Sequence, residues 1–194
     1  ARYAMTGLKN AYVEMNNVES YFAYIKTLQG YGDINTTEKD SLLYTSGENL
    51  YITSKYDKAR EVFNNYLTEF PNGIFRQNAQ FYLAECLRSG GITDDALKLY
   101  ASISSEPNNQ FTEQALIAAS EISFTKEDYV SAYDYYTKLE KASTTAENTN
   151  IALKGQLKSA YEEGDAQKSI NAAGKILNTG SLPEELAREA RFIR

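Results

Sequence analysis

Three glutamates at matching places in the chain are the first residues whose spacing suggests a chemical role. Glu48, Glu85 and Glu121 are separated by 37 and 36 residues. Carboxylates pair with basic groups, so a regular row of them can hold a partner that carries lysine or arginine. The same row can instead bond to neighbouring helices or keep a surface hydrated, because charged side chains are mostly solvated. Both interpretations are open from the sequence.

Catalytic chemistry has few candidate groups. The chain contains no histidine, which is the commonest general base and metal ligand. Its one cysteine, Cys86, has no histidine to activate it, and we predict a buried packing residue. The sequence has no nucleophile elbow, phosphate-binding loop or Cys/His cluster. We therefore predict a protein that is not an enzyme and that uses no cofactor or catalytic metal.

Composition restricts the partners. Of 194 residues, 42% are hydrophobic and 24% are charged, which is typical of a folded domain. The net charge of −6 argues against nucleic acid, which needs a basic footprint. No apolar run approaches the roughly 18 residues of a membrane span. Because the sequence opens at Ala1 and closes inside an amphipathic stretch, we expect an excerpt of a longer protein, with any targeting signal elsewhere.

The stretch from residue 47 to residue 71 predicts the end of one helix, a tight turn and a second helix. From Tyr56 to Phe70 the apolar residues fall three and four apart, which makes one continuous helical face. Pro71 ends that helix, because proline disfavours the α conformation of the residue before it. Thr37 is predicted to cap the helix that precedes the turn. One helix pair cannot bury such a face, so stacked copies are expected.

The chain is repetitive. Residues 8–28 and 157–177 are identical at nine of 21 aligned positions. Each copy has a small residue early in its second helix, here named the register residue, at steps of 39, 37, 36 and 37: Ser20, Ala59, Ala96, Ala132 and Ser169. The residue four positions later is usually aromatic: Tyr24, Phe63, Tyr100, Tyr136 and Ala173. Small residues allow helices to cross closely, and large ones fill the space between pairs. By this count the first and fifth copies are one residue short at the turn.

These residues resemble the tetratricopeptide repeat. Gly47, Ala59, Phe63 and Pro71 stand where that family has its glycine, small residue, aromatic residue and closing proline. The resemblance covers nearly the whole chain as one solenoid, with copies at about 1–35, 36–73, 74–109, 110–146 and 147–180 and the start of a sixth at 181–194. The copies depart from the family in being longer than its period of about 34 residues. Ser123 also stands where a large apolar residue is usual.

Lengthened repeats with Phe-Pro-Asn-Gly before the next helix are similar to those of bacterial envelope proteins. Examples are the periplasmic partner of the Tol–Pal system and the lipoprotein of the β-barrel assembly machine. This likeness favours a periplasmic or envelope location, with the cytoplasm left open.

The resemblance implies an all-α, right-handed superhelical solenoid whose first helices line a concave groove. Counted back from the register residue, four rows of residues are expected on the groove: Ser41, Asn78 and Gln114; Tyr44, Phe81 and Ile117; Glu48, Glu85 and Glu121; Tyr51, Arg88 and Phe124. The outer copies place Lys9 and Lys158 in the glutamate row. The expected function is a scaffold that binds a peptide or protein segment, with basic groups on the glutamates.

Two other functions stay open. The chain could be a structural spacer or a self-association module, in which stacking itself is the function. It could also be an RNA-binding helical repeat of similar period, although the charge of −6 and the glutamate row oppose that.

Overall fold

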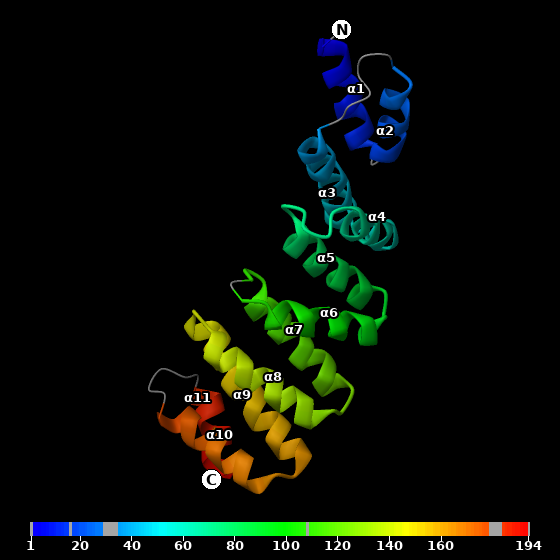
Figure 1. The fold of residues 1–194 in the computed structure, drawn as a ribbon. Coiled ribbons are helices and arrows are strands. Elements are labelled where there is room, and N and C mark those ends of the chain that lie inside the picture. The colour runs from blue at the N-terminus through cyan, green and yellow to red at the C-terminus, as the bar shows by residue number, and fades with distance from the viewer. Residues whose placement is uncertain (1, 16, 29–34, 108, 179–183, 194) are drawn as a thin grey trace. The chain divides into compact units, whose positions relative to one another are not determined.

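The computed structural model describes residues 2–15, 17–28, 35–107, 109–178 and 184–193. Regular structure in these ranges is entirely α-helical, which confirms the predicted fold class (Figure 1). The helices are α1 (Arg2–Glu14), α2 (Val18–Lys26), α3 (Thr36–Ile52), α4 (Tyr56–Glu69), α5 (Arg76–Ser89), α6 (Thr93–Ser105), α7 (Thr112–Thr125), α8 (Tyr129–Ala142), α9 (Ala146–Glu163), α10 (Ala166–Asn178) and α11 (Glu184–Ile193). Within the two units described below, successive helices pack on one another, as in a TPR-like solenoid. Residues 181–183 of the expected sixth copy lie outside the described ranges.

The chain forms two compact units, residues 1–96 and residues 97–194, each described by itself below. In unit 1, α3 packs against α4 and also contacts α5, and α4 packs against α5. In unit 2, α8 packs against both α7 and α9, and α10 packs against both α9 and α11. Each unit therefore has its own row of stacked helices.

The turns inside the helix pairs from α3 to α10 share one geometry. Each contains a residue with positive φ five positions before the register residue: Ser54, Gly91, Glu127 and Gly164. The following residue donates back to the first helix, as Lys55 N–H does to the Leu50 carbonyl at 2.9 Å and Asp165 N–H to the Ala160 carbonyl at 3.0 Å. The fifth copy therefore has a turn of the usual length, and the prediction that it is one residue short is wrong.

The first pair follows the same turn with a different register. Asn17 N–H donates to the Tyr12 carbonyl at 2.9 Å, which is the bond that Lys55 makes with Leu50. This alignment makes Tyr21, 5% exposed, the equivalent of Ala59, whereas Ser20 is exposed. The predicted register of the first copy is wrong by one residue, and that copy is not short at its turn either. Ser20 matches the expected small residue in type, but the buried residue at this place is its neighbour Tyr21.

The other register residues are confirmed. Ala59, Ala96 and Ala132 are fully buried, and Ser169 is 4% exposed. Gly47 shows why the first helix needs a small residue too: a Cβ there would lie 2.7 Å from the Phe63 ring. The ring thus packs directly on the helix backbone, which permits a close helix crossing.

Cys86 is 2% exposed, which confirms the predicted packing role. Burial, with the nearby charge of Glu85, raises the pKa of its thiol to about 11. Nucleophilic chemistry requires the thiolate, so this thiol is poorly suited to it.

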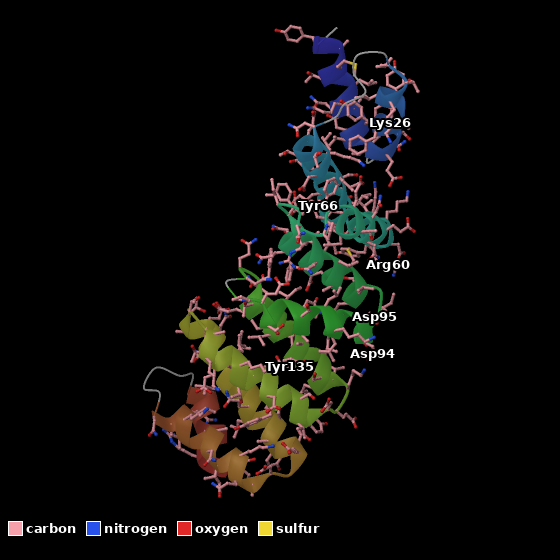
Figure 2. All side chains as sticks on the ribbon, in the orientation of Figure 1. Lys26, Arg60, Tyr66, Asp94, Asp95 and Tyr135 are labelled. Atoms are coloured by element: carbon pink, nitrogen blue, oxygen red, sulfur yellow. The ribbon has the colours of Figure 1, made fainter. Side chains whose placement is uncertain are left out.

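A carboxylate at the start of α3 connects unit 1's helix pairs. The Tyr66 hydroxyl donates to Asp40 Oδ1 at 2.6 Å, and Ile74 N–H donates to Asp40 Oδ2 at 3.0 Å. Tyr66 is labelled in Figure 2. A Cβ at Gly73 would lie 2.4 Å from the Tyr66 hydroxyl oxygen, so the glycine of Phe-Pro-Asn-Gly is required by this contact. The N-cap of α3 is Asn35, whose side chain accepts from Thr37 N–H at 3.0 Å, and not Thr37 as predicted.

Unit 2 has the same connection at the same repeat position. Glu113 and Asp40 both lie 19 residues before a register residue. Glu113 accepts from Thr144 N–H at 3.2 Å, from the Thr144 hydroxyl at 2.7 Å and from the Asn148 amide at 2.6 Å. In both units, therefore, a carboxylate near the start of a first helix holds the segment that leads into the next helix pair. We name these two residues the tether carboxylates.

Candidate partner-binding surface

The twelve residues expected on a groove belong to three helices. Eight lie in unit 1, on α3 and α5: Ser41, Tyr44, Glu48, Tyr51, Asn78, Phe81, Glu85 and Arg88. Four lie in unit 2, on α7: Gln114, Ile117, Glu121 and Phe124.

In unit 1, Tyr44 positions Glu48. The Tyr44 ring is 4% exposed and stacks on Phe75 with ring centroids 4.4 Å apart. Its hydroxyl donates to Glu48 Oε1 at 2.7 Å and is hydrogen-bonded to Asn78. Burial, and then the bond to Glu48, raises the pKa of Tyr44 far above its usual range. Tyr44 is therefore a packing residue that orients the half-buried Glu48 carboxylate.

The space between α3 and α5 is filled by aromatic rings. The rings of Tyr51 and Tyr82 are 4.7 Å apart, and Tyr82 stacks on Phe63 of α4 at 5.9 Å. Burial, and then the charge of Glu85, raises the pKa of Tyr51 to about 12. Glu48, Tyr51, Tyr82 and Glu85 form a surface that we name the acidic-aromatic strip.

Tyr82 was missed by sequence reasoning. Its equivalents in the other copies are Thr45, Ala118 and Gly155, so a search for residues common to all copies passed over it. The available signal was its spacing of three residues from Glu85 on one helix, which places the two side chains on one face.

The remaining unit 1 residues of the expected groove are Ser41, Phe81 and Arg88. The Ser41 hydroxyl donates to the Thr37 carbonyl of its own helix at 3.0 Å. The ring of Phe81 lies against Tyr82 with centroids 5.9 Å apart, and Arg88 is exposed.

In unit 2, α7 presents exposed Gln114 and Glu121. Ile117 and Phe124 are partly buried against a cluster that includes Leu116 and Tyr136. These two apolar residues contribute to packing as well as to the surface.

A pocket of about 220 Å³ lies in unit 2, and sequence reasoning did not predict it. Residues of α7, α8 and α9 line it: Phe124, Tyr136, Ile151, Lys154, Gly155 and Lys158. Gly155 allows the Tyr136 ring to pack directly on the backbone of α9, because a Cβ there would lie 2.4 Å from that ring. Lys158 stands in the glutamate row, and Lys154 is one helical turn before it. We name this feature the lysine-rimmed pocket.

The described ranges were also compared with the requirements of a metal site and of a membrane-spanning helix. No group of three or more His, Cys, Asp or Glu side chains there could hold a metal ion. No helix in the same ranges is both long and apolar enough to cross a membrane.

Comparison with known families gives one match. The family model described as Tetratricopeptide repeat matches residues 78–109. These residues are therefore similar to a tetratricopeptide repeat. A search of curated proteins found no match to the chain. The TPR match covers most of α5 and all of α6, and it indicates a protein-interaction scaffold with protein partners.

Proposed function

We propose that this TPR protein is a non-catalytic scaffold that binds an extended peptide or protein segment on its first helices, with basic groups of the segment on the glutamates. The observation that carries the proposal is the acidic-aromatic strip. Its carboxylates lie beside tyrosine rings that already pack on one another, so little ordering is needed on binding. Stability in a repeat protein comes from contacts between neighbouring repeats, which leaves one face available for a partner.

The partner chemistry follows from the strip. A lysine or arginine side chain can pair with Glu48 or Glu85 while its aliphatic part lies on Tyr51 or Tyr82. Backbone-extended segments present such side chains at alternate positions, which suits carboxylates on successive first helices. A bacterial envelope setting, proposed from the Phe-Pro-Asn-Gly likeness, agrees with a scaffold that assembles other proteins.

Random linear peptides selected on the immobilised chain test this proposal. We expect enrichment of peptides that carry lysine or arginine next to apolar residues. Reversing Glu48 and Glu85 of the strip together to lysine should weaken the selected peptides by about tenfold or more, because each ion pair contributes up to about 1 kcal/mol. The paired Glu48→Gln, Glu85→Gln variant controls for added repulsion, and circular dichroism confirms folding. Equal binding by the folded reversed variant would remove the proposal.

Self-association is a second candidate, and one observation favours it. Tyr3 of α1 is 97% exposed and Phe192 of α11 is 90% exposed, although large apolar side chains are usually covered. Sedimentation between low and high micromolar concentration should then show mass increasing with concentration, and the change Phe192→Ser should reduce it. A constant monomer mass would exclude self-association as the function.

A further inference from the structure

We propose that the lysine-rimmed pocket of unit 2 binds an apolar side chain flanked by acidic residues, within an internal segment of a partner protein. The inference rests on the proposed scaffold function and adds a site of opposite charge preference to the glutamates. Its basis is the combination of an open apolar pocket with two lysines at its rim.

The two lysines are available for an anion. Lys154 and Lys158 are both exposed and lie one turn apart on the same face of α9. Within the ranges that the structure describes, neither has a hydrogen bond or an ion pair. A like-charged pair at this spacing slightly destabilises a helix. In a chain with 26 acidic and 20 basic residues, an unpaired lysine pair beside a pocket is complementary to an acidic ligand.

The size of the pocket selects one side chain. Its volume of about 220 Å³ is below the roughly 300–1,000 Å³ of small-molecule sites. The apolar part of the lining comes from Phe124, Tyr136 and Ile151, and Ile151 is 36% exposed. A phenylalanine or leucine side chain can therefore enter as an anchor, while carboxylates on either side of it meet the lysines at the rim. Anchors of this type carry most of the affinity in small interfaces.

Synthetic peptides test the proposal directly on the full chain. The probe is an acetylated and amidated peptide with the centre Glu-Phe-Glu, flanked by glycine and serine and labelled for fluorescence anisotropy. Replacing the centre by Glu-Ala-Glu should weaken binding by about thirtyfold, the loss expected for a buried anchor. Replacing it by Gln-Phe-Gln should weaken binding by about tenfold, because two exposed ion pairs are lost. A Lys-Phe-Lys centre should bind least.

Variants of the protein locate the site. The double change Lys154→Gln with Lys158→Gln should reduce binding of the Glu-Phe-Glu peptide by the same factor as Gln-Phe-Gln and should leave the melting temperature unchanged. The matched control is Lys141→Gln on α8, an exposed lysine that does not line the pocket, and it should bind as the unchanged chain does.

Three results would overturn the proposal. They are equal affinity for the Glu-Phe-Glu and Lys-Phe-Lys peptides, unchanged binding by the lysine double variant, and binding only of a peptide that ends in phenylalanine with a free carboxylate. These outcomes are separate from the test of the glutamates, because that test uses basic peptides and changes at Glu48 and Glu85. A failure of this proposal is therefore distinguishable from a failure of the proposed function.

Discussion

The same place in the repeat is closed in unit 1 and open in unit 2. At this place unit 1 has Tyr82, whose ring stacks on Phe63 and touches Tyr51. Unit 2 has Gly155 there, and the neighbouring Tyr136 and Phe124 line a pocket. These residues are equivalent in the repeat, because the two members of each pair lie the same number of positions from the register residue of their own copy. The pairs are Tyr51 and Phe124, Phe63 and Tyr136, Tyr82 and Gly155, and Glu85 and Lys158.

The difference shows how one repeat framework yields two surfaces. In unit 1 a tyrosine fills the space between α3 and α5 beside acidic residues, whereas in unit 2 the position holds a glycine and a pocket lies there beside two lysines. The backbone turns are the same in both units, with a positive φ at Ser54 and at Gly164. Partner chemistry can thus change without altering the framework that positions it.

The largest effect is expected where the tether carboxylate is most buried. Asp40 is 5% exposed and accepts from Tyr66 and Ile74, so Asp40→Ala removes the acceptor of the buried Tyr66 hydroxyl and of the part-buried Ile74 N–H. We expect a loss of about 3 kcal/mol in the free energy of unfolding. Glu113→Ala is the matched change in unit 2, where water can replace the lost bonds, and it should cost about 1 kcal/mol. Urea unfolding measures both, and equal losses would contradict the difference in burial.

The next effect tests the close packing at Gly155. A Cβ there would lie 2.4 Å from the Tyr136 ring, and the ring is only 9% exposed and has little room to move. Gly155→Ala should therefore lower stability by about 2 kcal/mol through overpacking.

Gly174 of α10 is the control, because a Cβ there meets nothing within 4 Å. Gly174→Ala should raise stability by up to about 1 kcal/mol, as alanine favours helix. A gain at both positions would show that Tyr136 moves aside freely.

These two effects also mark what the sequence could and could not predict. The repeat spacing predicted the helices, the buried register residues from Ala59 onward and the buried Cys86, because periodic packing leaves periodic residue types. It missed the pocket, since Tyr82 and Gly155 share a position but no chemistry. It missed the tether carboxylates for a related reason. Asp40 and Glu113 differ in type, and their partners lie more than 25 residues away.

The first copy shows a different limit. Ser20 and Tyr24 satisfied the small-then-aromatic pattern, although Tyr24 is 44% exposed and Tyr21 is buried. The register that the structure shows, with Tyr21 and Ile25 at these positions, does not fit the pattern, and the turn hydrogen bond from Asn17 to Tyr12 together with burial reveals it. The location of the partner-binding residues stays a prediction. Glutamates at a regular spacing are expected both when they bind a partner and when they only bond to neighbouring helices, so the spacing does not distinguish the two roles.

Low pH should remove the stabilisation that the unit 2 tether carboxylate, Glu113, provides. The Asn148 amide, together with Thr144 and against the effect of burial, holds the pKa of Glu113 below its usual 4.5. A carboxyl group whose pKa is lower in the folded state contributes stability above its unfolded pKa, and this contribution disappears as the pH falls through the folded value. The melting temperatures of the unchanged chain and of Glu113→Gln should therefore differ at pH 7 and converge below about pH 4.5.

The control for this titration is Glu61→Gln, an exposed residue of α4. Its melting temperature should follow that of the unchanged chain throughout the range. If the Glu113→Gln difference persisted at pH 3, the stabilisation would come from the shape of the side chain and not from its charge.

The smallest change in stability is expected at Ser123, a buried residue of α7. Ser123 of unit 2 stands where unit 1 has Leu50, and it is 1% exposed. Among the described residues its hydroxyl oxygen has no hydrogen-bond partner, so burial removes it from water without compensation. Ser123→Ala should raise the free energy of unfolding by about 0.5–1 kcal/mol, because it deletes the unsatisfied group and leaves little void.

Ser120→Ala provides the contrast, since the Ser120 hydroxyl donates to the Ile117 carbonyl at 2.8 Å and its removal should not stabilise the chain. A loss of stability at Ser123 would mean that its hydroxyl finds a partner in solution, and unit 2 would then owe its open packing to polar contacts as well as to small side chains.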